Sequence, residues 1–192
     1  YDEKYSFNED WFSNNIPVWE LIFKTEINIE KQIEYLEIGS YEGRSTIYIC
    51  EEFKSFSITA VDPYLQYDEI EKYIDENDME KKYNIFRQNI NLFQDKVKFF
   101  RLSSDNFFKQ NKLFFDIIYI DGSHFANDVK KDFIQSIKIL NKNGLIIFDD
   151  FMWNHYTNMS DNPISGILPL LENFPELKVI FASDQLIIKK IS

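Results

Sequence analysis

Five short apolar runs recur along the chain and are separated by more polar segments. They are rich in Ile, Val, Phe and Tyr and cover residues 33–38, 57–61, 97–102, 115–120 and 145–148. Each run is nearly continuous rather than alternating with polar residues, which is typical of strands buried on both faces of a parallel sheet. We therefore predict five parallel strands at these positions.

Helical patterns lie between these runs. One helix is predicted over about 44–53, and another near 125–140, where apolar residues recur every three or four positions (Phe125, Val129, Phe133, Ile137 and Leu140). A short helix near Pro17 would bury Val18, Leu21, Ile22 and Ile27 on one face. Two last runs, 177–181 and 185–191, are joined by a short turn and predict an antiparallel hairpin at one edge of the sheet.

This alternation of strands and helices predicts an α/β fold. The expected architecture is a doubly wound, Rossmann-like sheet, mostly parallel, with an antiparallel C-terminal hairpin strand and helices on both faces. A length of 192 residues suits one domain, residues 1–192, in which residues 1–30 form an N-terminal lid segment. The acidic stretch 68–82 is interpreted as a solvated helix pair. The first residue is Tyr1 rather than Met, which favours a trimmed protein or a domain of a longer polypeptide.

The charge balance narrows the class of partner. With 32 acidic and 21 basic residues the net charge is −11, the wrong sign for binding nucleic acid or an anionic membrane. The single cysteine, Cys50, excludes an internal disulfide framework and is expected in the core. No apolar run approaches the roughly 18 residues of a membrane span, and no signal peptide opens the chain. We therefore expect a cytoplasmic protein.

Acidic side chains mark the ends of four of the five predicted strands. They are Glu37, Asp62, Asp121, Asp149 and Asp150. In an open α/β sheet, ligands bind at the carboxyl ends of the strands. We therefore expect these acids to converge on one crevice.

A glycine turn follows the first predicted strand, in the run EIGSYEGRST (residues 37–46). A dinucleotide loop has the pattern G-x-G-x-x-G, in which the second glycine makes room for a pyrophosphate. Here Tyr41 occupies that position, and the pattern is G-x-x-x-G between Gly39 and Gly43. Asp62, at the end of the next strand, could accept hydrogen bonds from a ribose. The combination favours a nucleoside cofactor with a cationic end and no phosphate, although a plain strand-to-helix turn would look similar.

Four motifs in this order resemble those of class I S-adenosylmethionine-dependent methyltransferases. They are YLEIGSYEGRS (35–45), VDPY (61–64), DIIYIDGSH (116–124) and GLIIFDD (144–150). The set is most similar to the small metal-dependent sugar and macrolide O-methyltransferases, with catechol O-methyltransferase as a more distant relative. The resemblance covers essentially the whole chain. It implies methyl transfer from S-adenosylmethionine to a hydroxyl of a sugar or glycan.

The resemblance also implies roles for individual residues. Ser103 and Ser104 would lie beside the adenine, and Tyr41 and Ser45 would contact the cofactor. The complete implied cofactor site is Glu37, Gly39, Ser40, Tyr41, Gly43, Ser45, Asp62, Ser103, Ser104 and Asp121.

A metal site and a base complete the expected active site. Three carboxylates in one cleft repel one another unless a cation is present, and hard oxygen ligands suit Mg²⁺, Ca²⁺ or Mn²⁺. By the resemblance, Asp121, Asp149 and Asp150 would hold the metal. His124 would be the general base, with Asp121 as the second catalytic residue; a histidine suits proton transfer at neutral pH. His155 and Trp153 lie just beyond, in a loop that could wall the acceptor site, and Trp11 and Phe12 are further candidate lid contacts.

Several alternatives stay open from the sequence. The acceptor could be a catechol or another small molecule, and protein methylation is not excluded by the residues. A nicotinamide-dependent oxidoreductase would use the same sheet but needs the pyrophosphate glycine. A non-catalytic cofactor-binding or scaffold domain would keep the sheet but would not need three acidic residues and His124 together. If the acceptor is a glycan, a fused or partner glycosyltransferase is the expected neighbour.

Overall fold

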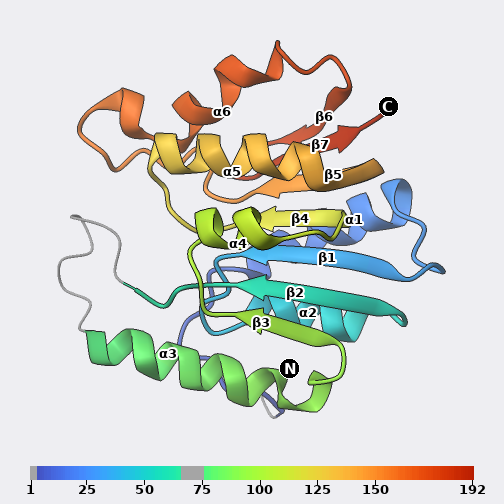
Figure 1. The fold of residues 1–192 in the computed structure, drawn as a ribbon, viewed down its shortest axis with the longest axis vertical. Coiled ribbons are helices and arrows are strands. Elements are labelled where there is room, and N and C mark those ends of the chain that lie inside the picture. The colour runs from blue at the N-terminus through green and yellow to red at the C-terminus, as the bar shows by residue number, and fades with distance from the viewer. Residues whose placement is uncertain (1–3, 66–75) are drawn as a thin grey trace.

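A computed structural model describes residues 4–65 and 76–192 of the chain. Within these residues, seven strands form one sheet in the order β3-β2-β1-β4-β5-β7-β6 (Figure 1). The first five are parallel, whereas β7 runs antiparallel to both of its neighbours. The strands are β1 (Ile33–Ile38), β2 (Phe56–Val61), β3 (Val97–Phe100), β4 (Phe115–Ile120), β5 (Leu140–Phe148), β6 (Leu177–Ala182) and β7 (Leu186–Lys190). The predicted fold class is confirmed.

Helices cover both faces of this sheet. They are α1 (Ile16–Glu26), α2 (Arg44–Glu52), α3 (Glu76–Asn89), α4 (Ser104–Gln110), α5 (Ala126–Ile139) and α6 (Pro163–Leu171), with short 3-10 helices η1 (Ser13–Asn15), η2 (Ile90–Phe93) and η3 (Met159–Asp161). One core cluster joins the sheet to α1, α2 and α3, and a second joins the opposite face to α4, α5 and α6. Each central strand is therefore buried on both sides, which explains its continuous apolar sequence.

Some predicted boundaries were wrong, and tertiary contacts explain why. Strand β5 begins at Leu140, not at 145. Leu140 pairs with Phe115 across a register shift, although the residues that follow Leu140 are polar. Leu21, expected on the buried face of α1, is 62% exposed, and Trp19 and Phe23 are buried instead. The stretch from 68 to 75 lies outside the described residues, while 76–82 does belong to a helix, α3.

Helix α6 was not predicted, because its sequence PISGILPLL carries an internal proline and a glycine. The glycine has a packing reason. A Cβ atom on Gly166 would lie 2.2 Å from the carbonyl oxygen of Ala126, so only glycine lets α6 approach α5 this closely. Among the described helices, none has both the length and the apolarity needed to cross a bilayer.

Candidate functional site

The glycine turn after β1 is built so closely that it needs a residue without a side chain. Gly39 has a φ of +86°, and a Cβ atom there would lie 1.9 Å from the backbone oxygen of Asp121. Gly43 has a φ of +83°, and its Cβ would lie 2.8 Å from the ring of Phe86 in α3. Both angles are in the region that favours glycine. The loop 39–43, here called the glycine loop, thus packs directly against the end of β4 and against α3.

Asp62, at the end of β2, organises this loop. Its Oδ2 accepts the backbone N–H groups of Ser40 and Tyr41, each at 2.9 Å, and its Oδ1 accepts that of Tyr64 at 2.7 Å. Burial raises the pKa of Asp62, and these three N–H groups oppose that effect. An ionised carboxylate has about four acceptor positions, so capacity remains for a further donor.

Glu37 lies beneath the glycine loop and is fully buried. It accepts hydrogen bonds from the hydroxyls of Ser45 and Thr46 at the start of α2. Burial raises the pKa of Glu37 to about 7, although both hydroxyls oppose the shift. A carboxyl group in this state would ionise readily when a cation binds nearby.

Tyr41 adopts a left-handed backbone conformation, with φ at +47°. The hydroxyl of Tyr64 donates a hydrogen bond to the Tyr41 carbonyl oxygen. The Tyr41 hydroxyl bonds Glu9, and burial together with that contact raises the pKa of Tyr41 to about 12. Its side chain therefore faces the N-terminal segment.

The two serines predicted to lie beside an adenine begin helix α4, immediately after β3. Ser103 is its N-cap, and the Ser103 hydroxyl accepts the backbone N–H of Asn106 at 3.4 Å. Because β3 is next to β2 in the sheet, Ser103 and Ser104 lie on the Asp62 side of the site. Their contact with a ligand stays a prediction.

Asp132 of α5 is buried close to Ser104 and was not singled out by the sequence, because it sits among the charged positions of an amphipathic helix. Burial raises the pKa of Asp132 from its ordinary 3.8 to about 7. The Ser104 side chain opposes this shift, while Asp105 and Asp128 add to it and Lys131 reduces it.

This shift predicts a pH-dependent stability. The folded protein binds the proton more tightly than the unfolded chain, so the stabilisation by this group is lost as pH rises from about 3.8 to about 7. Asp132→Asn should flatten this part of the profile. Urea unfolding of both proteins at about pH 5 and about pH 8 measures the difference. Parallel profiles for the two proteins would show that Asp132 is not protonated in this window.

Asp121, Asp149 and Asp150 form an acidic cluster where β4 and β5 end side by side. The hydroxyl of Tyr119 donates to Asp121 Oδ2 at 3.0 Å and also bonds Asp149 Oδ2. Burial, Asp149 and Asp150 together hold the pKa of Asp121 well above its usual range. Burial likewise raises the pKa of Asp149. Three crowded carboxyl groups make this a place that favours a proton or a cation.

His124 belongs to the same cluster. Its Nε2 lies 2.8 Å from Asp150 Oδ2, and Asp121, His124 and Asp150 each offer a ligand atom within 4.8 Å of the others. Asp149, predicted as a third metal ligand, lies beside this trio and is joined to Asp121 through Tyr119. Asp150 has a φ of +49°, an unfavourable angle for a residue with a side chain.

Three polar residues that sequence analysis missed surround Asp149. Besides Tyr119, Asn15 places its Nδ2 at 3.4 Å from Asp149 Oδ2, and Gln185 lies near enough to oppose in part the rise in the pKa of Asp149 that burial causes. Gln185 is itself fixed by the indole N–H of Trp19 at 2.8 Å. A strand tyrosine looks like core, and Asn15 and Gln185 are far away in sequence, so no local signal identifies them.

Aromatic residues form a wall beside the acids. The ring of Trp153 stacks on that of His124 at 4.9 Å with an interplanar angle of 14°. His155 and Tyr156 meet the Trp153 ring at steep angles, 4.9 and 4.8 Å away. Trp153 thus lies against the cluster and His155 lies against Trp153, while their predicted role as a wall of the acceptor site stays a prediction. Phe12, a candidate lid contact, is buried in the core against Trp19 instead.

Comparisons with known proteins give a family match and several solved structures of similar fold. The model of the methyltransferase domain family matches residues 36–151. A curated relative, an uncharacterized protein of Acanthamoeba polyphaga mimivirus, is 30% identical over 121 residues. This match covers 62% of the chain and 52% of the relative, so the chain spans about half the length of that protein.

Solved structures show the same fold at low sequence identity. The O-methyltransferase of Bacillus cereus in complex with S-adenosylhomocysteine (SAH) is 18% identical, with a TM-score of 0.66 over 97% of this chain and 84% of the other. The O-methyltransferase TomG of Streptomyces achromogenes, solved with S-adenosylmethionine (SAM), is 9% identical, with a TM-score of 0.66 over 95% and 82%. The methyltransferase MycE, solved with Mg and SAH, is 14% identical, with a TM-score of 0.66 over 98% of this chain and 50% of the other.

Proposed function

Because this chain belongs to the methyltransferase domain family, we propose that it transfers a methyl group from S-adenosylmethionine to a hydroxyl of a sugar or glycan. The observation that carries the proposal is the cluster of Asp121, His124 and Asp150 beside the glycine loop. The glycine loop, together with Asp62, suits a nucleoside cofactor. The cluster of Asp121, His124 and Asp150 suits deprotonation of an acceptor oxygen.

Cofactor binding would use the ends of β1 and β2. SAM supplies a methyl group on a positively charged sulfur, which is already electrophilic. Asp62 retains acceptor capacity for a ribose hydroxyl, and Glu37, with a pKa of about 7, would gain charge beside a cationic ligand. Tyr41 stands where a pyrophosphate would need glycine. The structures solved with SAM or SAH support the choice of cofactor.

Acceptor activation would use the cluster after β4 and β5. Asp121 and Asp150 offer oxygen ligands for Mg²⁺ or Mn²⁺, and mutual repulsion of the acids favours a cation there. A bound divalent cation would lower the pKa of an acceptor hydroxyl. His124 would accept the proton, while Asp150 and the stacked Trp153 ring hold the imidazole in place. Asp149 would support Asp121 through Tyr119 or act as a further metal ligand.

The proposed acceptor is neutral and carries neighbouring hydroxyls. A net charge of −11 and the acidic cluster disfavour anionic acceptors. The exposed side of the aromatic wall suits the apolar face of a sugar ring as well as a planar catechol. The sugar is preferred because the motifs at 116–124 and 144–150 resemble those of sugar O-methyltransferases. MycE, solved with Mg and SAH, supports the metal-assisted form of the proposal.

An acceptor screen tests the proposal. Purified protein is incubated with SAM, Mg²⁺ and one candidate acceptor at a time: deoxysugars, glycosides and short oligosaccharides, with a catechol for comparison. The masses of the products are measured by mass spectrometry. Gain of one methyl group on a sugar hydroxyl supports the proposal. Methylation of the catechol alone would change the assigned acceptor from a sugar to a catechol, while the assignment of O-methyl transfer would remain. If Asp121→Asn protein, purified in the same way, were as active as wild type, the methylated product would come from a contaminating enzyme.

Metal removal should abolish turnover. We expect the demetallated protein to lose methyl transfer in excess chelator and to regain it with Mg²⁺ or Mn²⁺, because the crowded acids would otherwise hold protons. Asp150→Ala should raise the metal concentration needed, whereas its affinity for SAH should stay within a few-fold. Calorimetry and initial rates over a metal titration measure both. Full activity of the demetallated protein in chelator would show that the acids serve another purpose.

A further inference from the structure

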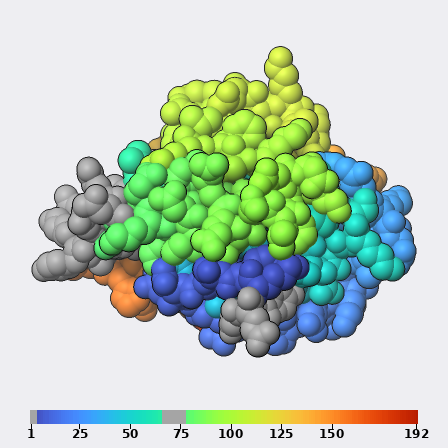
Figure 2. All heavy atoms as spheres, turned by 90° about the horizontal axis from the view of Figure 1, so that it is seen from below, coloured from blue at the N-terminus to red at the C-terminus, as the bar shows by residue number. Residues whose placement is uncertain are grey.

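The N-terminal residues 6–11, here called the strap, lie across the glycine loop and along α3. Figure 2 shows the N-terminal residues in dark blue running beside α3 in green. Asn89 of α3, only 2% exposed, exchanges hydrogen bonds with the backbone of Ser6, accepting at 2.9 Å and donating at 2.8 Å. The same Asn89 amide donates to the carbonyl oxygen of Glu42 at 2.9 Å. One buried amide therefore joins the strap, α3 and the glycine loop.

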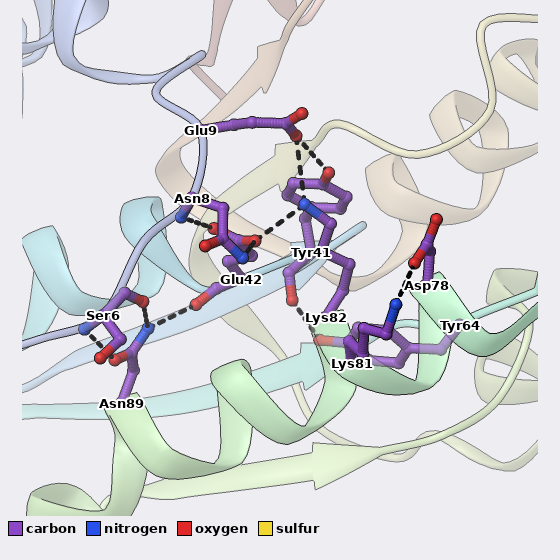
Figure 3. Close-up of polar contacts among 10 residues, drawn as sticks. All are labelled: Ser6, Asn8, Glu9, Tyr41, Glu42, Tyr64, Asp78, Lys81, Lys82 and Asn89. Carbon is purple, nitrogen blue, oxygen red and sulfur yellow. Dashed lines mark hydrogen bonds and ion pairs between the residues drawn. The ribbon is translucent and has the colours of Figure 1, made fainter. Parts of the chain in front are cut away.

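Glu42 is the charged centre of this junction (Figure 3). It is 1% exposed and accepts the backbone N–H of Asn8 at 2.6 Å, the Asn8 side chain at 3.0 Å and Lys82 Nζ at 2.9 Å. Burial alone would raise the pKa of Glu42, but Lys82 and Asn8 together lower it. Glu42 is thus held as a buried carboxylate, and such a charge strongly requires its partners.

Lys82 connects this charge to Tyr41. Its Nζ lies 3.3 Å from Glu9 in the strap and 4.6 Å from the centroid of the Tyr41 ring. The Tyr41 hydroxyl donates to the same Glu9 carboxylate. Trp11, at the end of the strap, stacks on Tyr41 at 5.2 Å and 15°. The Tyr41 side chain is therefore held by the strap and α3 together.

The backbone of Tyr41 reaches the predicted cofactor site. Its N–H donates to Asp62 Oδ2, the carboxylate that organises the glycine loop. A shift of Tyr41 would therefore change the donors on Asp62 and the backbone conformation of the loop. The left-handed φ of +47° at Tyr41 means that the contacts around it must maintain this conformation.

We propose that Lys82 is a positioning residue, which acts through Tyr41 and the strap to set how tightly and how long the cofactor is held. It does not touch the reacting atoms. It balances Glu9 and Glu42 and keeps the strap closed over the glycine loop. The proposal rests on the proposed function only in taking SAM as the cofactor.

The test compares binding of SAH to wild type, Lys82→Met and Lys82→Arg. Lys82→Met keeps the aliphatic stem and removes the charge. We expect the dissociation constant to rise about tenfold, mainly through faster dissociation, which is a usual size for coupling between linked sites. Lys82→Arg should recover part of the affinity. Calorimetry and stopped-flow displacement measure the two quantities.

Neighbouring residues supply matched controls. Lys81, also in α3, pairs with Asp78 at 2.6 Å on an exposed surface, so Lys81→Met should bind SAH as wild type does. Trp11 is 71% exposed, so Trp11→Ala leaves the core intact and should weaken binding several-fold by removing the stack on Tyr41. Hydrogen exchange of residues 6–11 should accelerate in Lys82→Met but not in Lys81→Met.

The outcomes separate this proposal from the proposed function. If wild type does not bind SAH, the cofactor assignment fails, whereas the exchange experiment still tests whether Lys82 closes the strap. If wild type binds and Lys82→Met and Trp11→Ala bind equally well, the positioning role is wrong. If Lys82→Met fails to fold, Trp11→Ala decides the matter alone. Equal losses in Lys81→Met and Lys82→Met would also contradict the proposal, because they would show a general effect of charge.

Discussion

Gly39→Ala is expected to destabilise the folded protein by about 2–5 kcal/mol, combining a left-handed backbone angle with forced overpacking. The new Cβ would lie 1.9 Å from the backbone oxygen of Asp121. Neither side can give way easily, because Gly39 N–H donates to Val61 and Asp121 N–H donates to Ile38, both at 2.8 Å. Urea unfolding measures the change in free energy of unfolding.

Gly122→Ala is the matched control. Its Cβ would meet the nearest atom, in the Ile38 side chain, at 3.5 Å, which is an ordinary contact. This variant should therefore keep most of the wild-type stability. If Gly39→Ala were as stable as Gly122→Ala, the close passage of the glycine loop over the end of β4 would be wrong.

His124→Ala is expected to lower the rate of methyl transfer by about 10²- to 10⁴-fold, the usual contribution of a general base. His124 is not among the residues expected to hold the cofactor, so affinity for SAH should change little. Rates are measured on the best acceptor of the screen, with saturating SAM and Mg²⁺. Calorimetry with SAH checks that the cofactor site is intact.

His155→Ala serves as the comparison for this prediction. His155 meets the edge of Trp153 and is not part of the cluster formed by Asp121, His124 and Asp150. Its replacement should lower the rate less than tenfold, a smaller loss than removal of a base would cause. A normal rate in His124→Ala would contradict the role of His124 as the base and leave activation of the acceptor to the neighbouring acidic residues. Equal losses in both variants would instead point to a damaged aromatic wall.

Local sequence patterns predict the centre of the sheet well. The bounds of β1 and β4 agree with the apolar runs, because every residue but one in each strand is buried. Strand β5 begins earlier than its pattern suggests, since pairing of Leu140 with Phe115 overrides the polar residues that follow. Helix α6 contains an internal proline and a glycine, and the glycine is explained only by close packing against α5. Local pattern thus fails where a distant segment decides the structure.

The candidate site shows the same division. Glu37, Asp62, Asp121 and Asp150 are visible in sequence because acids at strand ends must share one edge of a parallel sheet. Tyr119 is invisible because it continues an apolar strand. The contacts of Lys82 with Glu9 and Glu42 span 73 and 40 residues, so no periodicity reveals them.

Calorimetric titration of the wild-type protein with SAH, and separately with NAD, tests the central claim most directly. The account predicts one-to-one binding of SAH and no binding of NAD, because Tyr41 replaces the glycine that a pyrophosphate requires. Asp62→Ala should weaken SAH binding by about 1.5–3 kcal/mol, the contribution of a hydrogen bond to a charged group. Tight binding of NAD without binding of SAH would contradict the account and assign the sheet to a nicotinamide cofactor.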